Sequence, residues 1–99
     1  MARRPKHPGV ILQEIYLDNF GMGSAALAEA LHVPGERVAA ILRGQASMDA
    51  DMALRLGRYF DKEGAYWLNL QQNYDLAKAE AEHDYSGIAK HPTITSFFP

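Results

Sequence analysis

The stretch GSAALAEALHVPGERVAAILRG, residues 23–44, decides the fold that the sequence predicts. Its first part predicts a helix over 24–31, because leucines and alanines recur there at helical spacing. A second helix is expected over 35–42, since Pro34 suits the start of a helix and Gly44 suits a left-handed C-cap. Two short helices joined by a tight turn predict a helix-turn-helix.

The second of these helices has two different faces. Val38, Ile41 and Leu42 are expected to face the protein interior. The outward residues are Glu36, Arg37, Ala40 and Arg43. A helix with such an outer face can enter the major groove of DNA. Two packed helices also occur in any small helical domain, so the pattern alone leaves a structural and a DNA-binding interpretation open.

Composition limits the class of protein. The chain has 99 residues, which predicts one domain, and 47% of them are apolar, enough for a small core that dimerisation would enlarge. It has no cysteine, and its longest apolar runs are too short to span a membrane, so we expect a cytoplasmic protein. The net charge of −2 argues weakly against a non-specific nucleic-acid binder, although a local basic face remains compatible with it.

Three further helices surround the helix-turn-helix. Apolar spacing predicts one from His7 to about Phe20, one from the N-cap Asp49 to Phe60, and one over 64–82. The expected fold is therefore all-α, with five helices in one domain.

The last helix carries more apolar surface than one face of a small domain needs. Trp67, Leu70 and Tyr74 are expected to pack on the helix-turn-helix. The remaining large apolar residues are Tyr66, Leu68 and Leu76, which we expect to form a dimer interface.

The ends of the chain differ from the middle. Residues 1–6 are expected to form a flexible basic arm that is either disordered or touches phosphates. Residues 7–82 are expected to form the helix-turn-helix domain, and residues 83–99 a tail without helical period. Within the tail, 93–98 has the composition of a strand but no partner strand, and Phe97 and Phe98 are candidates for packing on another chain.

Catalysis is not expected. The four histidines lack the spacing of metal ligands, and Ser24 has no evident base. No glycine pattern typical of nucleotide binding is present. The sequence therefore predicts a protein that is not an enzyme and that needs no metal or cofactor.

Several motifs together resemble one known family. They are HPG at 7–9, ALAEALHV at 26–33, VAAILRG at 38–44, ADMALRLGRYF at 50–60 and YWLNLQQNYDL at 66–76. In this combination the chain resembles the HigA/VapI family, antitoxins of the Xre-like (Cro/C1-type, lambda-repressor-like) helix-turn-helix class. The resemblance covers about residues 7–76.

The resemblance implies a function and partners. A family member is expected to be a homodimer whose recognition helices enter successive major grooves of double-stranded operator DNA. It would neutralise a HigB-type toxin, a ribonuclease that cuts mRNA, and repress its own operon.

The candidate DNA contacts fall into two groups. Phosphate contacts are expected from Ser24, Gly35, Arg43 and Gln45, Gly35 contributing its helix N-terminal N–H group. Base contacts are expected from Arg37 and Glu36, with the Ala40 methyl group available to a thymine methyl. For Glu36 two alternatives are open: it holds Arg37, or it only interacts with the helix N-terminal dipole.

Three departures from the family pattern weaken the expected DNA contact. Gly23-Ser24 replaces the usual Ser-Gln pair, Gln45-Ala46 replaces a basic loop, and Ala39-Ala40 replaces a polar reader. Two alternatives therefore stay open: a toxin-binding protein with weakened DNA binding, and an orphan Xre-type transcriptional regulator without a toxin.

Overall fold

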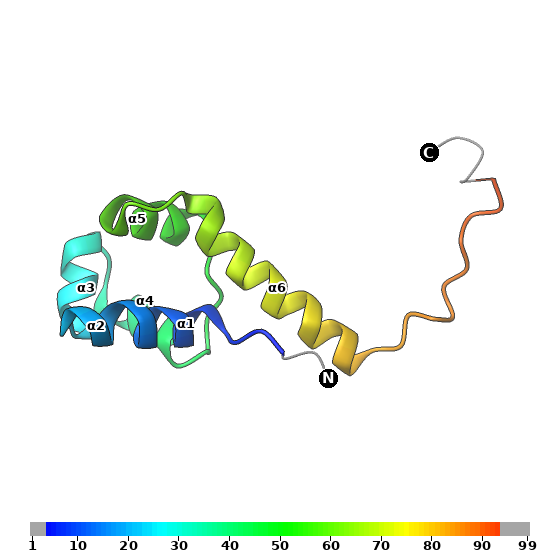
Figure 1. Ribbon diagram of the computed structural model, residues 1–99, viewed down its shortest axis with the longest axis horizontal. Helices are drawn as coiled ribbons and strands as arrows, with labels where there is room; N and C mark the ends of the chain where they lie inside the picture. Colours follow the sequence, from blue (N-terminus) through cyan, green and yellow to red (C-terminus); the bar gives the residue numbers. More distant parts are fainter. Residues whose placement is uncertain (1–3, 94–99) are drawn as a thin grey trace.

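The chain folds into helices connected by short turns. The structure is a computed structural model that describes residues 4–93. Its elements are α1 (Pro8–Ile11), η1 (Leu12–Leu17), α2 (Asp18–Phe20), α3 (Ser24–Leu31), α4 (Gly35–Leu42), α5 (Ala50–Phe60) and α6 (Gly64–Glu82). The first three follow one another without a break, so they form one helix, and the described residues contain five helices and no strand (Figure 1). The all-α prediction is confirmed.

The first helix contains a feature that the sequence analysis did not predict. Its middle part, η1, is a turn of π-helix, in which the hydrogen bonds run from residue i to i+5. Leu12 and Leu17 lie five positions apart, and each is only 1% exposed. The wider turn brings both leucines to the side that faces the core, and Tyr16 lies beside them, 9% exposed.

The HPG motif starts this helix by a specific arrangement. The Gly9 N–H donates to Nδ1 of His7 at 2.9 Å, so the histidine is the N-cap, and Pro8 occupies the first turn. A Cβ added to Gly9 would lie 2.0 Å from the carbonyl oxygen of Ile41. The first helix and α4 therefore touch backbone to backbone, and only glycine allows this approach.

The predicted core is present, with Trp67 at its centre. The indole is fully buried, and its ring centroid lies 5.0 Å from those of Tyr16 and Tyr66 and 6.2 Å from that of Phe60. Leu70 packs against the same cluster. Leu42, expected to face inward, is only partly buried at its edge.

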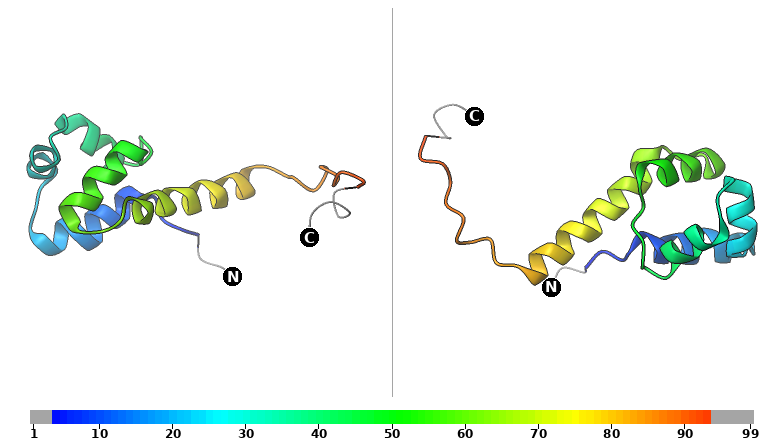
Figure 2. Two further views of the ribbon diagram at one scale, coloured as in Figure 1. Left: turned by 90° about the horizontal axis from the view of Figure 1, so that it is seen from above. Right: turned by 180° about the vertical axis from the view of Figure 1, so that it is seen from behind.

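The helical bundle has one long projection. Figures 1 and 2 show α6 running out of the bundle, and the segment after Glu82 leaving it as an extended chain. Residues 83–93 are exposed and contain no helix. Phe97 and Phe98, the predicted contacts of the tail, lie outside the described residues, as does Arg3 of the basic arm.

Candidate nucleic-acid interface

Helix α4 has the two faces that the sequence predicts. Val38 and Ile41 are 1% and 2% exposed and belong to the core. On the opposite side Gly35, Glu36 and Arg43 are exposed, and Ala40 is half-buried between them. The outer stripe of α4 is therefore free of contacts with the core.

The starts of α3 and α4 leave backbone donors available. The N-caps, Gly23 and Pro34, make no side-chain hydrogen bond to their helices. The first-turn N–H groups of an uncapped helix can donate to a phosphate. Ser24, half-buried, is the first residue of α3, and Gly35 is the first of α4.

Arg37 does not extend freely from α4 as its position in the sequence suggests. Its Nη2 donates to both oxygens of Asp49, at 3.1 and 3.2 Å, and its Nη1 lies 2.9 Å from Oδ2 of Asp51. The side chain is 34% exposed. The guanidinium therefore bridges two carboxylates at the start of α5.

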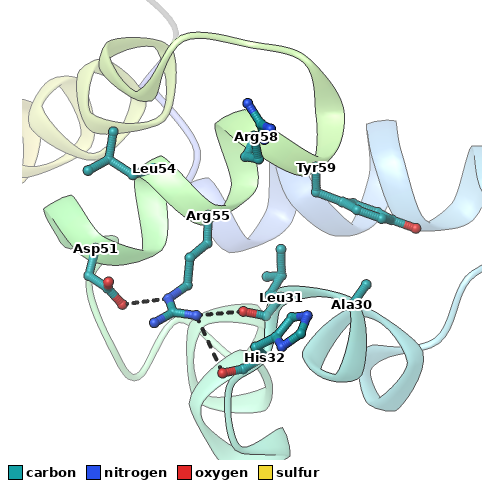
Figure 3. Close-up of a pocket in the computed structure, with 8 residues that line it drawn as sticks. All are labelled: Ala30, Leu31, His32, Asp51, Leu54, Arg55, Arg58 and Tyr59. Atoms are coloured by element: carbon teal, nitrogen blue, oxygen red, sulfur yellow. Dashed lines mark hydrogen bonds and ion pairs between the residues drawn. The ribbon is translucent and has the colours of Figure 1, made fainter.

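The Asp51 carboxylate also belongs to a second ion pair. Arg55 donates from Nε to Oδ2 of Asp51 at 2.9 Å and from Nη1 to the carbonyl oxygen of Leu31 at 2.7 Å (Figure 3). The hydrogen bonds from Arg55 and then from Arg37 lower the pKa of Asp51. A continuous polar network thus connects the end of α3, α4 and the start of α5.

Arg43 is also paired. Its Nη2 forms a short ion pair with Oε1 of Glu36, and its Nε donates to Oε1 of Gln45 at 2.9 Å. Each of the two arginines contributed by α4 and its C-cap therefore has an acidic partner, which lowers the net positive charge of this face.

The loop after α4 rests on His7. A Cβ at Gly44, whose φ is +73°, would lie 3.9 Å from the His7 ring. The same ring packs against Tyr74 of α6 in a T-shaped arrangement, at a centroid distance of 5.1 Å. Burial lowers the pKa of His7, and the backbone of Ala46 beside it acts in the opposite direction. The His7 ring thus lies beside the loop that carries Gln45.

The described part of the basic arm lies against the protein rather than extending outward. Arg4 and Pro5 line a small hollow together with Tyr74 and Lys78 of α6. Nζ of Lys6 lies 3.4 Å from Oε2 of Glu14.

A groove along α6, beside Met48 of the loop before α5, contains two of the three predicted dimer residues. Leu68 is 37% and Leu76 55% exposed, and both line a cavity of about 520 Å³. Tyr66 differs, because it is half-buried in its own chain and accepts a hydrogen bond from the Tyr16 hydroxyl at 3.2 Å. Burial and this bond raise the pKa of Tyr16 to about 12.

Gln71 is a structural residue that sequence reasoning missed. It is 5% exposed, accepts from the Met48 N–H at 2.7 Å and donates to Asp75 at 2.9 Å. A polar residue in an otherwise apolar stretch was the available signal. Gln71 ties the loop before α5 to α6.

A second hollow lies beside the Arg55 network, away from the outer stripe of α4. It measures about 530 Å³, and its apolar lining includes Leu54, which is 66% exposed, and Tyr59 (Figure 3). Among residues 4–93 no group of three His, Cys, Asp or Glu side chains is arranged to hold a metal ion. No helix in the same range is long and apolar enough to cross a membrane.

Comparison with known proteins identifies clear relatives. No family model matches the chain. Virulence-associated protein I of Dichelobacter nodosus is 50% identical over 76 residues, which cover 77% of this chain and 70% of that protein. The structure of PA4674 of Pseudomonas aeruginosa with its operator DNA matches with a TM-score of 0.86 at 44% identity, covering 91% of this chain and all of that one. The P. aeruginosa antitoxin HigA with the higBA promoter matches with a TM-score of 0.78 at 51% identity, over 80% and 86% of the two chains.

Proposed function

Because the chain belongs to the HigA/VapI family of helix-turn-helix antitoxins, we propose that it represses its own operon and neutralises a HigB-type toxin. The observation that carries the proposal is the match to two structures solved with operator or promoter DNA, at TM-scores of 0.86 and 0.78. Both are more than 40% identical to this chain. The DNA-binding half of the proposal follows most directly from these matches.

The outer stripe of α4 supplies the groups that read the operator. The methyl group of Ala40 contacts a thymine methyl, and Glu36 restrains Arg43 through their ion pair. Arg37 pairs with guanine O6 and N7 when it leaves its carboxylate partners.

Phosphate contacts fix the register on the duplex. They come from Ser24, Arg43, Gln45 and the first-turn N–H groups at Gly35. Since Arg43 is paired with Glu36, few cations are free to neutralise phosphates, and the salt dependence of binding is modest.

Reading an inverted repeat requires a homodimer. The exposed Leu68 and Leu76 form an apolar groove on α6 that a second copy would cover. Tyr66, half-buried in its own chain, contributes a smaller part of this interface. Two recognition helices would then lie about 34 Å apart, one turn of DNA.

The test is binding to a duplex from the chain's own promoter. We expect a complex of two chains per inverted repeat, and Arg37→Ala should weaken it by about 1–3 kcal/mol and relax base preference. Fluorescence anisotropy against native and scrambled duplexes measures both. Arg58→Ala is the matched control, because Arg58 lies on the last turn of α5 and not on the helix-turn-helix.

One observation favours a second candidate function. The acidic partners of Arg37 and Arg43 reduce the positive potential of the DNA-facing side, as expected of a toxin-binding protein with weakened DNA binding. Equal affinity for native and scrambled duplexes, combined with co-purification of the neighbouring gene product, would favour this candidate. Specific operator binding would exclude it.

A further inference from the structure

The Arg37 guanidinium is shared by two carboxylates that each have another partner. Asp49 accepts the Met52 N–H at 2.8 Å and so caps α5. Asp51 keeps its ion pair with Arg55 at 2.9 Å. If Arg37 leaves, each carboxylate keeps its other hydrogen-bond partner. Breaking the ion pairs of Arg37 therefore leaves neither carboxylate without a partner.

The Arg37 side chain and the two carboxylates are all accessible to solvent. The Asp49 and Asp51 side chains are 62% and 53% exposed, and Arg37 is 34% exposed. Ion pairs in such positions are weak and exchange readily. A phosphate or a guanine edge can therefore replace them, whereas it could not replace a buried pair.

We propose that Asp49 and Asp51 act as an intramolecular competitor for Arg37 and thereby lower the affinity of the chain for its operator. This inference rests on the proposed function. We call Arg37, Asp49 and Asp51 the carboxylate clamp. In the closed clamp Nη1 and Nη2 of Arg37 both face carboxylates, and these are the groups that a bidentate contact to guanine uses.

The clamp acts through the fraction of chains in which Arg37 is free. When only part of a population is competent to bind, the apparent affinity falls by that fraction. Weakening the clamp raises the free fraction, and operator affinity rises with it. Scrambled DNA, which offers Arg37 a poorer contact, gains less, so discrimination between the two duplexes rises as well.

Asp49→Asn tests this without removing the helix cap, because asparagine is as good an N-cap as aspartate. We expect operator affinity to rise by up to about fivefold, the range of an exposed ion pair. Asp51→Asn tests the other half of the clamp and leaves the cap unchanged. Both are measured by anisotropy with the native operator duplex and a scrambled duplex.

The decisive measurement is a double-mutant cycle. In an Arg37→Ala background, Asp49→Asn should raise affinity no more than Glu29→Gln, which removes one negative charge from α3 without touching Arg37. Equal gains with and without Arg37, or a loss of operator affinity in the single variants, would overturn the clamp while leaving operator binding intact. A wild-type chain that does not bind the operator would overturn the proposed function and the clamp together.

Discussion

Interactions of two different kinds hold helix α4 on its two sides. On the inner side Val38 and Ile41 are buried, and the backbone of Gly9 packs directly against the Ile41 carbonyl group. Arg37 is held by exposed ion pairs to α5, and on the outer side Glu36 pairs with Arg43. The inner contacts are apolar and close-packed, whereas the other contacts are polar and open to solvent.

Because of this difference, the position of α4 in the fold and its affinity for DNA depend on different contacts. Close packing contributes most of the stability and is not screened by salt, so it fixes the position of α4 in the fold. Exposed ion pairs contribute at most about 1 kcal/mol and can be exchanged for DNA phosphates. We therefore expect substitutions on the inner side to change folding, and substitutions among the ion pairs to change DNA binding.

Gly9→Ala should have the largest effect on stability. The new methyl group would meet the Ile41 carbonyl oxygen at 2.0 Å, so the first helix and α4 must separate. We expect the free energy of unfolding to fall by about 3 kcal/mol, the upper range for overpacking. Urea unfolding followed by circular dichroism measures it.

Gly35→Ala is the matched control for Gly9→Ala. It makes the same chemical change at the start of α4, where a Cβ meets nothing within 4 Å. Alanine is the better helix former, so stability should stay the same or rise by up to about 1 kcal/mol. Similar losses in both variants would mean that the backbone contact between the first helix and α4 does not limit packing.

His7→Ala should have a smaller effect, about 1–2 kcal/mol, from the lost N-cap of the first helix. His7 also makes stability depend on pH. Its pKa is lowered in the folded chain, mainly by burial, with Lys78 acting in the same direction and Asp75 against it. As the pH falls through 6.5, the ordinary value, the unfolded chain takes up the proton first, and stability is lost until the pH reaches the lowered pKa.

Urea unfolding at pH 7.5 and 5.5 measures this pH dependence. His7→Asn keeps a capping side chain but cannot titrate, so this variant should lose less stability than the wild type between the two pH values. A pH dependence that is the same in wild type and His7→Asn would show that His7 does not cause it.

The parts of the fold that the sequence predicted are those encoded by residues close to one another in the chain. The helices over 24–31, 35–42 and 64–82 match the predicted bounds residue for residue, because turns, caps and apolar spacing are encoded by neighbouring residues. The cap at Asp49 and the burial of Trp67 are confirmed for the same reason. Such features need no knowledge of the tertiary structure.

The partners of the polar side chains were not predictable. Arg37 meets Asp49 and Asp51, which follow it by 12 and 14 residues, only because a loop turns α5 back beside α4. The π-helical turn in η1 also depends on the core that Leu12 and Leu17 share. Sequence periodicity therefore predicted the exposed face of α4 but not the ion pairs that its arginine makes with α5.

Glu36→Gln should have the smallest effect on stability. It should lower the free energy of unfolding slightly and at the same time raise the affinity for the operator. It removes an exposed ion pair with Arg43 and a negative charge in the first turn of α4, so unfolding should become easier by about 0.5–1 kcal/mol. Operator affinity should rise, because Arg43 is released and a charge that repels phosphates is gone. Glu29→Gln is the matched control: it removes one negative charge from the helix-turn-helix without releasing Arg43, so operator affinity should rise less than in Glu36→Gln. If Glu36→Gln lowers affinity instead, Glu36 itself contacts a base, and the Glu36–Arg43 pair on the outer side of α4 is part of the reading surface rather than a restraint on it.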